Sequence, residues 1–468
     1  MRRSRHFFEL ITSKSRVLAQ FFAAQGITMA GNLLYGLLCV RLLPASEYAK
    51  FVVLFGVQGT LIVLMDINFS GTLVPLIGER VDNHQLIADY VASLRKLAQW
   101  IYALIAVAAV VAYPLLVRNR GWSWRTVAAM VVILLVSTWF MRVSAAYGTV
   151  LILLRDRAYW YRGQMISSLG TLALLGAFWA FGVLSGFVAI LLNVAGIVFI
   201  GIFYHFRAQR LLGVPGYESV DKRRSIVKLA LPNVPQSLFY AFQGQISLFL
   251  IIYFGHASGV ASVGALSRLG QIFALASQMN PLLIEPYFAK LSRDRLKNSY
   301  GLVLLLAVIA CGVVTLAAAQ VPEVFLWLLG PQYKGLRTEV LISIATAAIG
   351  CLSGIMWAIH SARRFVYWWS NTVRLVLTLL LQVLFVTRLD LSTVRSVLWL
   401  NLVTIVASLS VNVMTGIYGF IRGPREVESG PREKSDTSIE ANAYLDQVES
   451  ADFGVPEPKH HQTADDHL

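Results

Sequence analysis

Long apolar segments constrain this chain more than any other feature of its sequence. About twelve of them divide the first 421 residues, and a helix of roughly 20 apolar residues crosses the hydrocarbon core of a bilayer. A helix is favoured there because it satisfies its own backbone hydrogen bonds, which lipid cannot do. The predicted spans cover residues 17–40, 51–77, 98–117, 126–154, 163–183, 185–206, 229–254, 259–284, 299–320, 340–360, 365–387 and 396–421. Between the second and third spans, residues 82–97 predict a short amphipathic surface helix capped by Asp82 or Asn83. We therefore expect an all-α polytopic membrane protein.

The composition excludes a soluble protein. Hydrophobic residues make up 57% of the chain, charged residues only 14%, and the mean hydropathy is +0.64. A formal net charge of +15 could indicate binding to nucleic acid. However, the Lys and Arg residues lie between the apolar spans rather than in one basic domain, as membrane orientation requires. We expect the lipid bilayer, and no nucleic acid, as a partner.

Signatures of catalysis and of metal binding are missing from the sequence. Cys39, Cys311 and Cys351 lie inside apolar spans and are too far apart for a metal-ligand pattern, so we interpret them as free and buried. The sequence has no H-E-x-x-H, no phosphate loop and no G-x-S-x-G motif. We expect no metal, no cofactor and no enzymatic activity.

Two related halves are predicted from a weak internal repeat and from the charge distribution. Leu-Ser and Leu-Asn pairs at 184–185 and 192–193 recur at 391–392 and 400–401. Lys and Arg are about three times as frequent in the predicted inner segments as in the outer loops, which favours cytoplasmic termini. The predicted organisation is a cytoplasmic N-terminus (1–16), a six-helix bundle (17–206), a cytoplasmic linker (207–228), a second six-helix bundle (229–422) and a disordered cytoplasmic tail (423–468).

Four ionisable residues fall near the middle of predicted spans: Asp66, Arg142, Arg268 and Arg374. Each must face a partner or a wet cavity, because a charge in hydrocarbon costs several kcal/mol. Some could form structural pairs, such as Asp66 with Arg142, or could snorkel. As a group they leave an excess of positive charge that favours an anion, and guanidinium groups match the oxygens of a diphosphate. Asp66 is predicted to act in coupling or in an ion pair.

Long amide side chains lie on polar stripes at helical spacing. The candidates for a cavity lining are Gln25, Asn32, Gln243, Gln271 and Gln278. Hydrogen bonding between helices is the alternative role for such residues in a membrane. Pro232, Pro235 and Pro281 predict bends that either let one half rock against the other or serve static packing.

Three motifs carry a resemblance to a known family. They are Arg41-Leu42-Leu43-Pro44 with Glu47-Tyr48, the exit of the second span from Pro75 to Glu79, and Leu328-Leu329-Gly330-Pro331-Gln332-Tyr333. Together with the topology, they resemble the Wzx-type polysaccharide and O-antigen flippases, the polysaccharide-transport branch of the MATE-like (MOP) superfamily.

The resemblance implies a V-shaped fold of two six-helix bundles, with a cationic lumen lined mainly by the first, second, seventh and eighth helices. It implies an undecaprenyl-diphosphate-linked oligosaccharide as substrate and the bacterial inner membrane as location. H⁺ or Na⁺ is the expected coupling ion. A polysaccharide polymerase and chain-length proteins are the expected partners.

Two other functions compete with this one. A cation-coupled exporter of drugs or metabolites from the same superfamily would need acidic lumen residues, whereas the mid-span excess is positive. A membrane polysaccharide polymerase or ligase would carry a large outer loop with catalytic residues, and the longest predicted outer loop covers only residues 321–339.

Overall fold

The computed structural model describes residues 23–67, 69–78, 80–231, 234–280, 284–291, 293–365 and 367–422. Within these ranges the chain forms helices and short turns and no β-strand, which confirms the predicted all-α class. Several predictions lie outside the described residues: the N-terminus 1–16, the tail 423–468, Pro232 and Pro281, and the side chains of Pro235 and Gln278.

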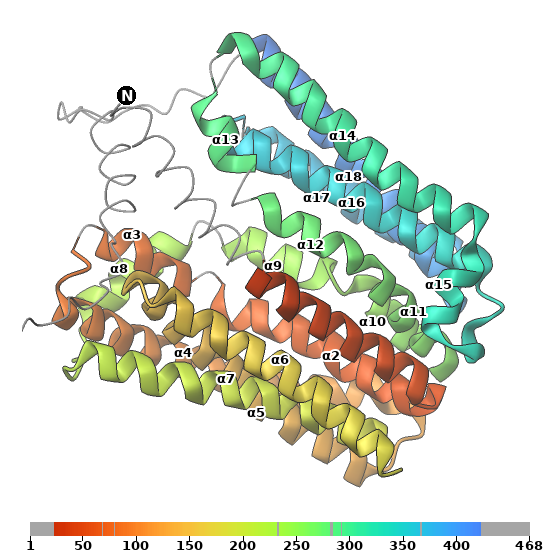
Figure 1. Cartoon of the computed structure of the whole chain (residues 1–468), viewed down its shortest axis with the longest axis horizontal. Helices are drawn as coiled ribbons and strands as arrows, with labels where there is room; N and C mark the ends of the chain where they lie inside the picture. Colours follow the sequence, from red (N-terminus) through yellow and green to blue (C-terminus); the bar gives the residue numbers. More distant parts are fainter. Residues whose placement is uncertain are drawn as a thin grey trace, which may run out of the picture. The chain divides into compact units, whose positions relative to one another are not determined.

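The N-terminal half begins with a helix at Ala23–Leu42. The elements that follow are α2 (Ala45–Asp66), η1 (Ser70–Thr72), α3 (Leu73–Ile77), α4 (His84–Val117), η2 (Arg118–Arg120), α5 (Trp124–Leu153), α6 (Arg157–Ala180) and α7 (Gly186–Leu212). Helix α5 packs chiefly along α7, and α6 packs against α7 (Figure 1).

The C-terminal half contains shorter helices followed by four long ones. Its elements are α8 (Val220–Ala230), α9 (Val234–Gln243), α10 (Ile246–Phe254), α11 (Ala257–Gly270), α12 (Ile272–Met279), α13 (Glu285–Lys290), α14 (Arg293–Gln320), α15 (Pro322–Leu329), η5 (Pro331–Tyr333), α16 (Arg337–Ala362), α17 (Trp368–Arg388) and α18 (Val394–Arg422). Helix α16 packs against α18 and α14, and Figure 1 shows these three helices beside one another.

Capping residues fix where several long helices begin. The side chains of Asn83 and Ser185 accept hydrogen bonds from the backbone N–H groups of Leu86 (2.9 Å) and Val188 (3.2 Å), at the starts of α4 and α7. Such caps satisfy donors that have no partner inside the helix. Gly213 ends α7 in the left-handed conformation (φ 65°), as a C-terminal glycine commonly does.

Ten helices among the described residues are long and apolar enough to cross a membrane, and eleven if the bent pair α9 and α10 forms one span. The eighth predicted span, residues 259–284, is not among these helices; it coincides with α11 and α12, which are separated at Gln271. These helices leave much apolar surface uncovered: Leu104 on α4 and Leu316 on α14 are 73% and 62% exposed. Exposed leucines of this kind suit contact with lipid, and the chain is a multi-pass membrane protein.

Three predicted segments differ in the structure. The predicted second span, 51–77, does not continue as one helix, because α2 ends at Asp66 and Ile67 adopts a left-handed conformation (φ 40°). The predicted surface helix at 82–97 and the span at 98–117 are instead one helix, α4, because no residue between them breaks the backbone hydrogen bonds. The predicted linker 207–228 is mostly helical, and only residues 213–219 separate α7 from α8.

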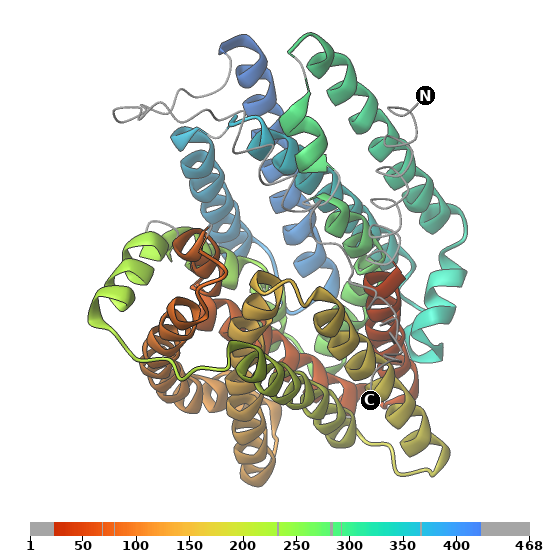
Figure 2. The ribbon, with the colours of Figure 1, turned by 60° about the vertical axis from the view of Figure 1, so that its left-hand side comes forward.

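The two halves meet where α2 packs against α9, α10 and α11 (Figures 1 and 2). Glycines allow this close approach. A Cβ atom on Gly264 of α11 would lie 2.3 Å from Val52 Cγ2 of α2, and one on Gly56 of α2 would lie 1.9 Å from Leu248 Cδ2 of α10. Since real Cβ atoms do not approach other atoms so closely, a larger residue at either position would require Val52, Leu248 or the helices that carry them to shift.

Hydrogen bonds also join the halves at one end of the bundles. The Gln332 side chain donates to the carbonyls of Val40 (2.8 Å) and Leu43 (3.2 Å), and Arg41 donates to the Trp327 carbonyl (3.2 Å). Two of the motifs that carried the family resemblance therefore contact each other. This end contains the C-terminus of the first helix and the start of α2.

Candidate functional site

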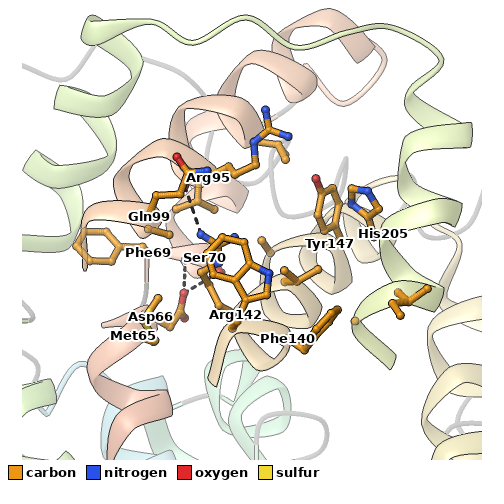
Figure 3. A pocket seen from close by; sticks show the side chains of 18 of the residues that line it. Met65, Asp66, Phe69, Ser70, Arg95, Gln99, Phe140, Arg142, Tyr147 and His205 are labelled. Atoms are coloured by element: carbon orange, nitrogen blue, oxygen red, sulfur yellow. Dashed lines mark hydrogen bonds between the residues drawn. The ribbon is translucent and has the colours of Figure 1, made fainter. Parts of the chain in front are cut away.

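A cavity of about 480 Å³ opens at the other end of the N-terminal half. It lies where α2, α5 and α7 approach their C-termini and where α4 begins, so side chains from four helices and the η1 turn reach it (Figure 3). Its polar lining consists of Asp66, Ser70, Arg95, Gln99, Arg142, Tyr147 and His205. Apolar residues such as Met65, Leu94 and Phe140 form the rest of the wall. Mixed linings of this kind are common in ligand sites.

Asp66 holds the turn that follows α2. One of its carboxylate oxygens, Oδ1, accepts hydrogen bonds from the backbone N–H of Ser70 (2.9 Å) and from the Ser70 hydroxyl (2.6 Å). Asp66 is thus at a helix break rather than in mid-helix as predicted, and it combines a capping role with a position on the cavity wall. Oδ1 accepts both hydrogen bonds from Ser70. The Asp66 carboxylate faces the cavity in Figure 3.

Arg142 projects from α5 and is the most deeply buried cation of the cavity, with 8% of its surface exposed. Its guanidinium group stacks over the Trp139 ring, 3.9 Å from the ring centroid, and donates to the Arg95 carbonyl (3.4 Å). Among the described residues no carboxylate oxygen lies within 4.0 Å of this guanidinium group. Asp66 and Arg142 therefore share a cavity without forming the ion pair that the sequence suggested.

Arg95 and His205 are site residues that the sequence analysis missed. Arg95 was assigned to a surface helix, but in the continuous helix α4 it lies one turn before Gln99 and lines the cavity with it. His205 of α7 packs edge-on against the Tyr147 ring, with 4.6 Å between centroids. Its buried Nδ1 atom has no hydrogen-bond partner among the described residues. A four-residue spacing between Arg95 and Gln99 was the signal that could have revealed this face.

The other predicted cations lie elsewhere. Arg268 of α11 faces the first helix and α2, with its guanidinium group 5.3 Å from the centroid of the Phe55 ring. Arg374 of α17 is 8% exposed; it donates to the Asn412 side chain of α18 and lies over the Trp357 ring at 5.2 Å. Neither residue lines the cavity at Asp66.

The amide residues that were predicted to line a cavity lie in separate parts of the structure. Gln243 of α9 accepts a hydrogen bond from the side chain of Gln382 of α17, which is the interhelical alternative. On the first helix Asn32 is exposed and Gln25 is half-buried, and Gln271 is half-buried at the end of α11. None of these amides lines the cavity at Asp66.

Metal-ligand clusters of three or more His, Cys, Asp or Glu side chains are absent from the described part of the chain. Cys39, Cys311 and Cys351 are free and buried.

Comparison with known proteins identifies the fold. No protein-family profile matches the chain, and no curated protein matches its sequence. A solved structure of the lipid II flippase MurJ in an inward closed conformation is similar, with a TM-score of 0.61 over 93% of each chain at 12% identity. An inward-facing multidrug resistance MATE transporter of the MOP superfamily matches 84% of this chain and 94% of its own, with a TM-score of 0.60 and 16% identity.

A third similar structure is a MOP superfamily transporter from Pyrococcus furiosus, described as having a binding pocket of reverse polarity that suggests a different function. Its TM-score is 0.51 at 13% identity, and the match covers 86% of this chain and 93% of that one. The chain therefore has the fold of MOP superfamily transporters, a group that includes exporters and a flippase.

Proposed function

We propose that this protein is a flippase for an undecaprenyl-diphosphate-linked oligosaccharide. It would carry the repeat unit of a surface or exopolysaccharide, including O-antigen, across the bacterial inner membrane. The observation that carries the proposal is the charge of the cavity, where two guanidinium groups, Arg95 and Arg142, face one carboxylate among the described residues, Asp66. An anionic ligand would balance this charge.

A diphosphate suits the buried cation best. Arg142 is fixed by the Trp139 ring on one side and by the Arg95 carbonyl on another, so part of its donor fork is already oriented. A fixed guanidinium fork binds two phosphate oxygens at once, and its attraction is stronger in a partly buried site than in water. The flippase fold among the similar structures supports a lipid-linked substrate.

Alternating access follows from where the halves contact each other. Gln332 and Arg41 tie them together at the end opposite the cavity, so the described conformation is closed at that end. We propose that both termini are cytoplasmic, which would place the cavity on the cytoplasmic side. There it could accept a substrate made in the inner leaflet. Breaking the hydrogen bonds of Gln332 and Arg41 would then open the periplasmic side.

The orientation can be tested with reporter insertions. Gly121, between η2 and α5, has open space around its Cα atom, and a reporter there should be periplasmic. A reporter fused after residue 422 should be cytoplasmic. The same side for both would contradict an odd number of crossings between Gly121 and residue 422. A reporter after Gly182, in the loop between α6 and α7, is the matched control and should agree with the one at Gly121.

A cation-coupled exporter is the second candidate, and Asp66 is the observation that favours it. A carboxylate that faces the cavity could bind H⁺ or Na⁺. In our proposal Asp66 supplies this coupling to the flippase, whereas an exporter would use it to bind a cationic substrate. A polysaccharide polymerase and chain-length proteins would act next to the flippase.

Arg268 and Arg374 remain proposed contributors to substrate binding. Arg268 lies between the halves, where a substrate leaving the cavity would pass. Arg374 already donates to Asn412, which itself donates to the Ser353 carbonyl at 3.1 Å, so its replacement would also disturb the packing of α16, α17 and α18. Transport and membrane level must therefore be measured together for both residues.

The test is flipping by the full-length protein in proteoliposomes that contain a polyprenyl-diphosphate-linked oligosaccharide. We expect the sugar to become accessible to an added lectin only when the protein is present. Arg268→Lys and Arg374→Lys should lower the rate about tenfold, because Lys keeps the charge and loses the fork. Transport of a cationic dye without flipping of the lipid would instead favour the exporter.

A further inference from the structure

A second cavity, of about 370 Å³, adjoins the first on the side of the linker between the halves. The two share Val91, Arg95 and Tyr147 in their linings, so Arg95 stands at their junction. The far wall is formed by Gln209 and Arg210 of α7 and by residues 213–216. Arg210, Arg95 and Arg142 therefore form a series of cations that runs from the surface to the buried cation of the first cavity.

The carboxylates around this second cavity are already engaged. Asp89 of α4 pairs with Lys222 of α8 at 2.5 Å, and Glu218 of the linker pairs with Arg223 at 3.1 Å. In the described part of the chain, no carboxylate oxygen lies within 4.0 Å of the Arg95 or Arg210 side chain. The second cavity therefore presents two guanidinium groups that an anion can approach.

The wall formed by the linker is held in place by α4. The Gln85 side chain donates to the Pro215 carbonyl (3.0 Å), and Asp89 accepts from the Tyr217 N–H (2.8 Å). Gly216 rests directly on α4, since a Cβ atom there would lie 2.0 Å from the Ala88 carbonyl oxygen. Three consecutive linker residues, 215–217, are thus held against one turn of α4 and fix the wall of the second cavity.

We propose that the second cavity is an entrance site for the phosphate groups of the transported headgroup, with Arg95 and Arg210 as ligands. This inference rests on the proposed function and adds a second site to it. Because Arg95 lines both cavities, a headgroup held by Arg210 and Arg95 can exchange Arg210 for Arg142 without losing its contact with Arg95. The linker shapes this site and confines the headgroup beside α4.

The test uses a single cysteine as a local reporter in the full-length protein, held in nanodiscs of zwitterionic lipid. Val214 lines the second cavity and is 39% exposed, and the three native cysteines are buried. We expect inorganic diphosphate and farnesyl diphosphate to slow alkylation of V214C by N-ethylmaleimide. Arg210→Gln should raise the diphosphate concentration needed about tenfold, as for the loss of one charge-assisted hydrogen bond.

The matched control is Arg207→Gln. Arg207 lies on the same helix and pairs with Asp156 at 2.7 Å, and it lines neither cavity, so this change should leave protection of V214C unaltered. An equal loss of protection in both variants would show a general charge effect and would overturn the entrance site.

A second reporter separates this inference from the proposed function. Gln99 lines only the first cavity, so Q99C reports on that site. Protection of Q99C without protection of V214C would overturn the entrance site and leave the proposed function standing, whereas protection of neither would contradict both. Equal protection of V214C by phosphatidylglycerol alone would assign the site to bilayer phosphates and overturn its role for the transported headgroup.

Discussion

Replacing Arg142 by Gln should abolish flipping of the lipid-linked oligosaccharide while the protein stays in the membrane. The side chain is buried against Trp139, its one hydrogen bond to the protein is long (3.4 Å), and no carboxylate of the described chain depends on it. Folding should therefore tolerate the change. The cavity, however, loses its most deeply buried cation, which an entering diphosphate would reach last. Arg142→Lys keeps the charge and loses the fork, so the rate should fall about tenfold.

The measurement is the flipping rate in proteoliposomes, normalised to the amount of inserted protein. Arg125→Gln is the matched control, because Arg125 is exposed near the start of the same helix, far from the cavity, and carries the same charge. Near-normal flipping by well-inserted Arg142→Gln would rule out the cationic cavity as the substrate site. A parallel loss in the Arg125 variant would point to charge in general rather than to this position.

The length of the apolar segments predicted the all-α class, because the length of a span is set by the bilayer rather than by local packing. The ends of the helices were harder to predict. Nothing in the run from residue 82 to residue 117 distinguishes a surface helix followed by a span from one long helix such as α4. The same holds for residues 259–284, where α11 ends at Gly270 and α12 begins after Gln271, because a lone glycine inside an apolar span is tolerated and does not by itself mark a break.

The candidate site was also predicted only in part. Asp66 and Arg142 were found because a charge inside an apolar span is conspicuous in a sequence, and they line one cavity. Arg95 was hidden among polar neighbours that appeared to belong to a surface helix. Arg374 is equally conspicuous in the sequence but is packed among α16, α17 and α18. Sequence spacing shows which face of a helix is polar, and it does not show which neighbour covers that face.

Cavity charge is the property that separates the two candidate functions within this fold. In this chain two guanidinium groups, Arg95 and Arg142, line the cavity beside one carboxylate among its described residues, Asp66. A cation-binding exporter would have to neutralise Arg142 and Arg95 before its substrate could enter.

Replacing Asp66 by Asn should separate the two roles of this residue and nearly stop transport. An Asn side-chain oxygen can still accept the hydrogen bond from the Ser70 N–H, so the turn after α2 should persist. The negative charge is lost, and with it the capacity to bind H⁺ or Na⁺ in a cavity that otherwise holds basic residues. If Asp66 couples transport to an ion gradient, Asp66→Asn should remove the response of the flipping rate to an imposed gradient.

Two further variants make this result interpretable. Asp66→Ala also loses both hydrogen bonds from Ser70, which costs about 1 kcal/mol or more, so its membrane level should fall below that of Asp66→Asn. Ser70→Ala removes only the 2.6 Å hydroxyl contact and keeps the carboxylate, so it should retain gradient-dependent flipping. A gradient response that survives in well-inserted Asp66→Asn would show that Asp66 serves the turn alone. The coupling site would then have to be another residue, although Asp66 is the only carboxylate among the described residues that line this cavity.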